Sequence, residues 1–248
     1  MYRYVCLFLT ALFIAAGCAT SEPTDEQPAD PEPTEQPADA VDEQLAKFDE
    51  QFRSLDTDAP PLGEGDGEQT ERRLAHMQQR DQFWRQRIQQ VQDLPMSDDE
   101  HDELAERIAD RTEEVDVEHA DELKAYLDDN PWPCRETIGP VADDAAFLLV
   151  QHADHDSDFQ RRVLEELEKL ADEQRTDTEN FALLYDRVAV NQDEPQRYGT
   201  QGDCTEDGWK MNDVEDPDKL DERRAELNLM PMESYRQLVE QMCEQMPD

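Results

Sequence analysis

The chain has few positive charges and no cluster of them. Its 248 residues include 23 Lys and Arg against 64 Asp and Glu, a formal net charge of −41, and only 5 of the cations are lysines. Nucleic acids and anionic lipid head groups are bound by clustered Lys and Arg, so this composition argues against both as partners. We therefore expect no nucleic-acid binding. The acidic excess is typical of the solvated surface of an exported protein from a saline habitat.

Long apolar runs are also lacking. The one candidate, Val5–Ala16, is about 12 residues long and falls short of the ~20 residues that span a bilayer as a helix. It follows the lone cation Arg3 and ends in small residues, which is the pattern of a cleaved secretory signal. We predict that residues 1–17 are a signal peptide and not a transmembrane segment.

A lipid anchor is predicted directly after this segment. Ala15-Ala-Gly-Cys18 resembles the lipobox of bacterial lipoproteins, although Ala15 stands where Leu is usual. The resemblance implies that Cys18 is acylated and becomes the mature N-terminus. Residues 18–40 contain five prolines, seven acidic residues and no cation, which predicts a disordered tether. We expect a protein of the cell envelope, lipid-anchored to a bacterial membrane and facing the periplasm or the exterior.

Cysteine is scarce beyond the anchor, where only Cys134, Cys204 and Cys243 remain. An exported compartment permits a disulfide. Because three cysteines cannot all pair within one chain, at least one thiol stays unpaired or forms a disulfide with another molecule. The spacing does not choose among the three possible pairs.

Hydrophobic residues make up 36% of the chain, a lean core, and they recur at helical spacing. We predict a mainly α fold, a helical bundle with a small β-hairpin insertion near the C-terminal third. A break in the helix predicted over 97–127 is expected near Val115–Glu118, and Asp81 interrupts the apolar stripe of the helix predicted over 70–92.

The predicted domains are a helical extension over 41–129 and a domain proper over 130–246. The predicted helices cover 41–55, 70–92, 97–127, 143–152, 158–172, 179–190, 216–227 and 231–246, and Tyr198–Gln201 and Trp209–Met211 flank the hairpin turn.

The histidines divide into two sets. His76, His101 and His119 lie in charged helix faces, where we expect solvated side chains. The segment Gln151–Asp158 gathers the other two histidines, His152 and His155, and three carboxylates. These residues could bind a divalent metal, or they could cap the next helix through Ser157 or Asp158. The spacing of established zinc motifs is missing, so we favour capping and predict no metal site.

Several motifs in the C-terminal half resemble domain of unknown function 6624, over roughly residues 130–246. They are Gln151-His-Ala-Asp154, Asp186-Arg187, Gln196-Arg-Tyr-Gly-Thr-Gln201, Glu215-Asp-Pro-Asp-Lys-Leu-Asp-Glu-Arg-Arg224 and Leu229-Met-Pro231. The pattern requires no histidine at position 155 and often has Gly where Asn228 stands. No activity is established for the family, so the resemblance implies a domain and no reaction or cofactor.

The matched polar residues have two interpretations. They could converge into a pocket for a polar ligand, or hold the hairpin onto the bundle as a buried hydrogen-bond network. We favour the pocket, in a lipid-anchored envelope protein that binds a small polar ligand or an envelope component. The predicted ligand-binding residues are Gln151, His152, Asp154, Asp186, Arg187, Gln196, Tyr198, Thr200 and Gln201.

Two further functions stay open. One is a hydrolase in which His152 is a general base oriented by a carboxylate such as Asp186, although no nucleophile can be identified beside it. The other is a structural envelope protein with no small-molecule site.

The anchor can be tested independently of these functions. We expect Cys18→Ser to move the protein from the membrane fraction to the soluble envelope fraction, because the variant lacks the thiol to which the lipid would be attached. Fractionation followed by immunoblotting measures this. Continued membrane attachment of the variant would show that Cys18 is not the acylated residue.

Overall fold

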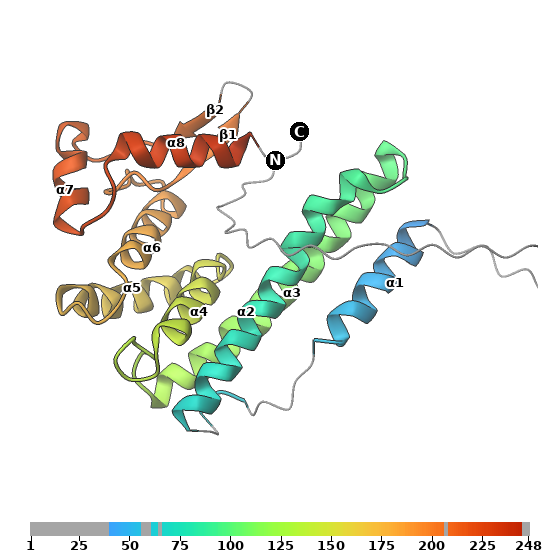
Figure 1. The fold of residues 1–248 in the computed structure, drawn as a ribbon, viewed down its shortest axis with the longest axis horizontal. Helices are drawn as coiled ribbons and strands as arrows, with labels where there is room; N and C mark the ends of the chain where they lie inside the picture. Colours follow the sequence, from blue (N-terminus) through green and yellow to red (C-terminus); the bar gives the residue numbers. More distant parts are fainter. Residues whose placement is uncertain (1–39, 56–60, 64–65, 206–207, 245–248) are drawn as a thin grey trace, which may run out of the picture.

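The computed structural model describes residues 40–55, 61–63, 66–205 and 208–244. The predicted signal peptide, Cys18 and nearly all of the predicted tether lie outside the described residues. Within the described ranges the fold is mainly α-helical with one antiparallel hairpin, as predicted (Figure 1). Its elements are α1 (Ala40–Arg53), α2 (Gly67–Gln90), α3 (Asp98–Asp129), α4 (Pro140–Gln151), α5 (Ser157–Asp172), α6 (Thr178–Asn191), β1 (Gly202–Thr205), β2 (Gly208–Met211), α7 (Leu220–Glu226) and α8 (Met232–Cys243), with short 3₁₀ turns at Val91–Asp93 and Pro217–Lys219.

The long helices α2 and α3 lie side by side and form the frame of the molecule (Figure 1). Each begins with a capping box, at Asp66 for α2 and at Ser97 for α3. The break expected near Val115–Glu118 is wrong, because α3 is continuous from Asp98 to Asp129. The spacing of apolar residues is interrupted there because an inward-facing position of the helix is occupied by His119, a polar residue that is nevertheless buried.

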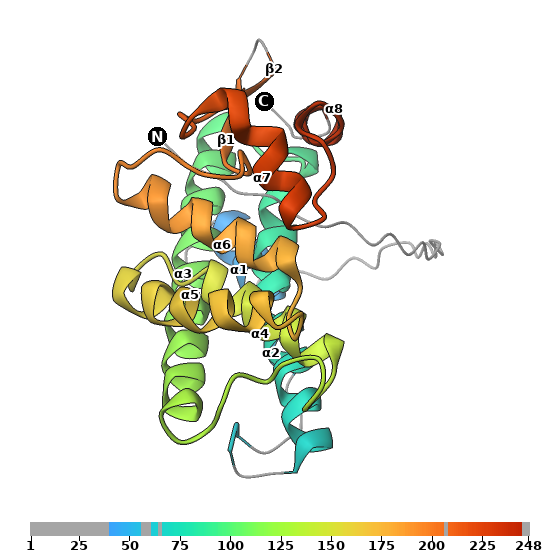
Figure 2. The same cartoon turned by 90° about the vertical axis from the view of Figure 1, so that its left-hand side faces the viewer.

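Two separate apolar clusters lie along this helix pair. One lies toward the turn between α2 and α3, where α1 packs over Trp84, Leu104 and Ile108. The other lies toward the open end, where α4, α5 and α6 cover Leu74 and Leu123. Figure 2 shows α5 and α6 one above the other in front of the frame. The boundary between the two clusters lies between Met77 and Phe83 of α2 and between Val115 and Ala120 of α3.

Two predicted helix starts are corrected. Asp156, and not Ser157 or Asp158, caps α5, because its side chain accepts a hydrogen bond from the Phe159 amide at 2.9 Å. The helix predicted from residue 216 begins later, at Leu220, and Asp216 makes no side-chain cap. Its backbone is left-handed, with φ of 36°, and a 3₁₀ turn precedes α7. None of the helices in the described part of the chain is both long and apolar enough to cross a membrane.

A disulfide fastens the hairpin to the last helix. Cys204 of β1 and Cys243 at the end of α8 are bonded, with their Cα atoms 5.5 Å apart. Trp209, Leu220, Met232 and other residues form a third apolar cluster beneath this link. Cys134 is the free thiol among the described cysteines and is buried. The structure thus selects one of the three pairs that the spacing left open.

We expect Cys204→Ser/Cys243→Ser to lower the free energy of unfolding by about 2–4 kcal/mol, because the open chain gains conformational freedom in the unfolded state. Urea unfolding monitored by circular dichroism measures the difference. A reducing agent should bring the wild type to the level of the variant and leave the variant unchanged. Alkylation of both cysteines in unreduced protein would contradict the pairing.

Candidate functional site

His152 caps the C-terminal end of α4 and forms a buried pair with Asp81 of α2. Its Nδ1 lies 2.7 Å from Oδ1 of Asp81, and the two residues are 8% and 1% exposed. The expected pairing of His152 with Asp186 is wrong, since Asp81 takes that place. The signal was present in the sequence: Asp81 interrupts the apolar stripe of its helix because it faces inward, toward α4, and is held there by a partner.

Arg85 and Asp116 complete this group, which we call the polar centre (Asp81, Arg85, Asp116 and His152). Arg85 donates to Asp81 at 3.1 Å and to both oxygens of Asp116, at 2.9 and 2.8 Å. The centre therefore links α2, α3 and α4 at the junction of the two apolar clusters.

Burial and charge act differently on the two carboxyl groups of the polar centre. Burial raises the pKa of Asp116 to about 6, and the neighbouring Asp81 carboxylate adds to the rise. Burial also favours a raised pKa for Asp81, but the adjacent His152 and Arg85 outweigh it and hold that pKa below its usual value. Asp81 therefore stays ionised and keeps the His152 ring in a fixed orientation.

A metal ion would meet competition in the polar centre. Asp81, Asp116 and His152 each offer a ligand atom, and these atoms all lie within 4.8 Å of one another. Arg85, however, already donates hydrogen bonds to both carboxylates, so a divalent cation would have to displace a guanidinium. We therefore describe the centre as an ion-paired network. His155 is exposed and takes no part in it.

A second polar group surrounds Asp154, two residues after His152. Arg187 of α6 forms a two-pronged ion pair with Asp154, whose side chain is 47% exposed. Gln160 donates to Asp154 at 3.0 Å and Asn191 at 3.1 Å. Burial favours a raised pKa for Asp154, but the Arg187 charge and these hydrogen bonds lower it below its usual value. Gln151 is buried at the last residue of α4.

Two buried polar atoms of this second group have no partner among the described residues: Nη1 of Arg187 and Oε1 of Gln160. The Gln160 amide is oriented by its nitrogen, which faces three acceptors, the Val150 and Gln151 carbonyls and Asp154. A reversed amide would place oxygen against oxygen. A charged donor and a neutral acceptor are thus left available beside Asp154.

The remaining motif residues form a third group that folds the chain ahead of the hairpin. Asp186 accepts hydrogen bonds from the amides of Arg197, Tyr198 and Thr200 and from the Thr200 hydroxyl, at 2.7–2.9 Å. Burial nevertheless raises the pKa of Asp186. The side chain of Gln196 donates to the carbonyls of Gln201 and Asn212, which flank the hairpin, and accepts a hydrogen bond from the Gln201 amide.

The predicted residues therefore lie in two places. Asp186 and Arg187 are neighbours on α6, and consecutive helical side chains point about 100° apart. Arg187 faces Asp154, while Asp186 faces the loop before the hairpin. The set near α4 contains Gln151, His152, Asp154 and Arg187, and the set near the hairpin contains Asp186, Gln196, Tyr198, Thr200 and Gln201. Tyr198 packs edge-on against Tyr185 at 5.6 Å.

The expectation of solvated histidines is wrong for His101 and His119, which are 7% and 1% exposed. His101 contacts the Leu94 carbonyl through Nε2 at 3.0 Å, and the ring of partly buried His76 lies 2.6 Å from the Leu55 carbonyl. Neither ring nitrogen of His119 has a hydrogen-bond partner in the described part of the chain. Charged neighbours in the sequence do not reveal which helix face meets another helix.

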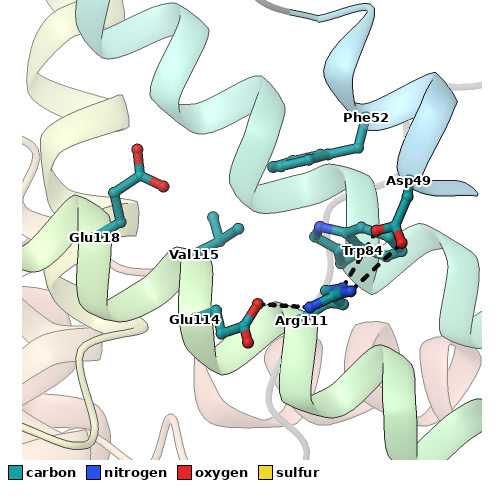
Figure 3. Close-up of a pocket in the computed structure, with 7 residues that line it drawn as sticks. All are labelled: Asp49, Phe52, Trp84, Arg111, Glu114, Val115 and Glu118. Carbon is teal, nitrogen blue, oxygen red and sulfur yellow. Dashed lines mark hydrogen bonds and ion pairs between the residues drawn. The ribbon is translucent and has the colours of Figure 1, made fainter.

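A pocket that the sequence did not indicate lies between α1, α2 and α3 (Figure 3). Its volume is about 200 Å³. Asp49 and Phe52 come from α1, Trp84 from α2, and the remaining lining residues from α3. The lining consists of Asp49, Phe52, Trp84, Arg111, Glu114, Val115 and Glu118.

These features define a predominantly helical protein with a disulfide-linked hairpin and a buried His–Asp–Arg centre. The model of the Family of unknown function (DUF6624) matches residues 68–245, and the chain belongs to that family. The match takes in α2 and α3, and thus Asp81, Arg85 and Asp116, which precede the motifs recognised in the sequence. No curated protein and no solved structure matches the chain.

His119 generates a prediction about pH. Burial lowers its pKa to about 4, from an ordinary value of 6.5. The neutral ring therefore contributes stability that is complete above about pH 6.5 and is lost as the pH falls toward 4, a loss of about 3 kcal/mol. We expect His119→Leu to remove this loss and to stay within about 1 kcal/mol of the wild type at pH 7, because it also removes unpaired polar atoms.

Urea unfolding of both proteins at pH 7.5 and pH 4.5 measures the difference. His155→Leu is the matched control, since His155 is exposed and its replacement should leave the pH dependence unchanged. An equal loss of stability on acidification in the wild type and in His119→Leu would contradict the assignment.

Proposed function

We propose that this protein is a lipid-anchored envelope protein that binds a small polar ligand beside Asp154, through His152 and Arg187. The observation that carries the proposal is the orientation of His152. Asp81 holds its Nδ1 at 2.7 Å, and Nε2 has no hydrogen-bond partner among the described residues. A ring fixed on one side and unpaired on the other is suited to meeting a ligand.

The neighbouring groups indicate what kind of ligand would fit. Arg187 Nη1 needs an acceptor and Gln160 Oε1 needs a donor. Asp154 already balances the charge of Arg187, so a neutral or zwitterionic molecule is favoured over an ion. The half-exposed Asp154 side chain connects this group to solvent. The ligand would therefore be a small molecule with both hydrogen-bond donors and acceptors.

The location in the envelope rests on the predicted signal peptide and the lipobox-like Cys18. The Cys204–Cys243 disulfide supports export, because such bonds persist in oxidising compartments. The acidic composition supports a soluble domain held off an anionic membrane surface by its tether.

A hydrolase is the second candidate, favoured by the same His152–Asp81 pair. A carboxylate that fixes the tautomer and orientation of a histidine is the arrangement of a general base. In the described part of the chain no Ser, Thr or Cys side chain is hydrogen-bonded to His152, so the base would have to activate water. The hairpin set fits a structural role, since the hydrogen bonds of Asp186 and Gln196 are to the backbone.

The ligand can be sought directly. Protein purified from the envelope fraction is denatured, and the released small molecules are quantified by mass spectrometry. We expect a polar molecule in near-stoichiometric amount from the wild type and at least tenfold less from His152→Gln, which retains a donor for Asp81. The exposed His155→Gln is the matched control and should release as much as the wild type.

The outcomes separate the candidates. No released molecule from any variant, with a lower melting temperature for His152→Gln, would contradict binding and favour a structural role. Conversion of the released molecule by the wild type, and its loss in Asp81→Asn, would identify the hydrolase.

A further inference from the structure

We propose a second binding site in the pocket between α1, α2 and α3, for a small organic cation that carries a carbonyl group. This pocket is separate from Asp154 and shares no residue with the polar centre. Its volume of about 200 Å³ is smaller than the roughly 300–1,000 Å³ of drug-sized sites, so it suits a small molecule.

Trp84 supplies the first argument. The residue is 1% exposed, and its indole Nε1 is a buried donor without a partner among the described residues. Figure 3 shows this nitrogen on the side of the ring that faces Val115 and the pocket. Leaving such a donor unpaired costs the free energy of the hydrogen bond that it makes to water in the unfolded chain. A ligand with an acceptor at this position would recover that energy.

The walls around Trp84 are apolar and well supported. The rings of Phe52 and Trp84 have centroids 5.3 Å apart, and Phe83 packs edge-on against Trp84 at 5.1 Å. The guanidinium of Arg80 lies 4.4 Å from the centre of the Phe52 ring. These contacts fix the aromatic walls, so the pocket offers a formed surface to the apolar part of a ligand.

The charge of the lining residues determines whether an anionic or a cationic ligand is favoured. Asp49, Glu114 and Glu118 face a single cation, Arg111, which gives the lining a formal charge of −2. Arg111 is already paired, with Asp49 at 3.2 Å and Glu114 at 3.0 Å. Arg80, which is not a lining residue, forms an ion pair with Glu118. When Arg80 is included, the formal charge around the pocket is still −1. An anion is therefore disfavoured, while a cation is attracted to the carboxylates and the aromatic rings.

Indole N–H signals of ¹⁵N-labelled protein test the proposal, because the chain has three tryptophans and Trp84→Phe assigns one of the signals. The probe is acetylcholine, which combines a carbonyl and a quaternary ammonium. We expect it to shift the Trp84 signal downfield and to leave those of Trp132 and Trp209 in place. Two matched probes separate the contributions. Butyltrimethylammonium lacks the carbonyl and should give no downfield shift, and 3,3-dimethylbutyl acetate lacks the charge and should bind about tenfold more weakly.

Variants locate the site within the pocket. Val115→Phe should fill the space and abolish the shift, while Val117→Phe, on the exposed face of the same helix, should not. Glu118→Gln is a milder change of a half-exposed residue and should weaken binding several-fold, with the exposed Glu113→Gln as its control.

Three results would overturn the proposal. The first is no response of the Trp84 signal to any probe, which would leave water as the partner of the indole. The second is the same response to all three probes, and the third is an acetylcholine response that is unchanged in Val115→Phe and in Glu118→Gln. None of these results depends on the ligand proposed beside Asp154.

Discussion

The hydrogen bond between His152 and Asp81, extended by Arg85 and Asp116, links the end of α4 to the α2–α3 frame at the junction of the two apolar clusters. Apolar packing holds α1 over one end of the α2–α3 frame and α4–α6 over the other. The polar centre occupies the junction, and charged groups there must pair with one another because water is largely excluded. Removing one partner would leave an uncompensated buried charge, so the four residues act as a unit.

The same logic explains the hairpin end of the molecule. A loop that turns sharply before β1 carries amide groups that no strand or helix can satisfy, and Asp186 accepts three of them. Arg224 donates to the Tyr198 and Met230 carbonyls from the other side. Motif residues that look like a binding site in sequence can therefore be the internal supports of a loop. Beside Asp154, in contrast, Arg187 and Gln160 each keep a buried polar atom without a partner among the described residues.

The helices were largely predictable, because their apolar spacing and their capping residues are local properties. The boundaries that failed depend on distant contacts. The expected break in α3 is absent because His119 fills an inward position that hydropathy assigns to the surface. The start of α5 shifted by one or two residues because several neighbouring residues are equally good caps and the chain path selects Asp156.

The sequence by itself determined the charge, the number and approximate extent of the helices, the hairpin and the family motifs, since each depends on composition or on residues close in the chain. The tertiary structure alone decided that Asp81 is the partner of His152, that Cys204 bonds Cys243, and that Asp186 and Arg187 face different groups. These are pairings between residues far apart in the chain, or directions around a helix. Such pairings and directions are established only when the packing of the helices brings two side chains within bonding distance.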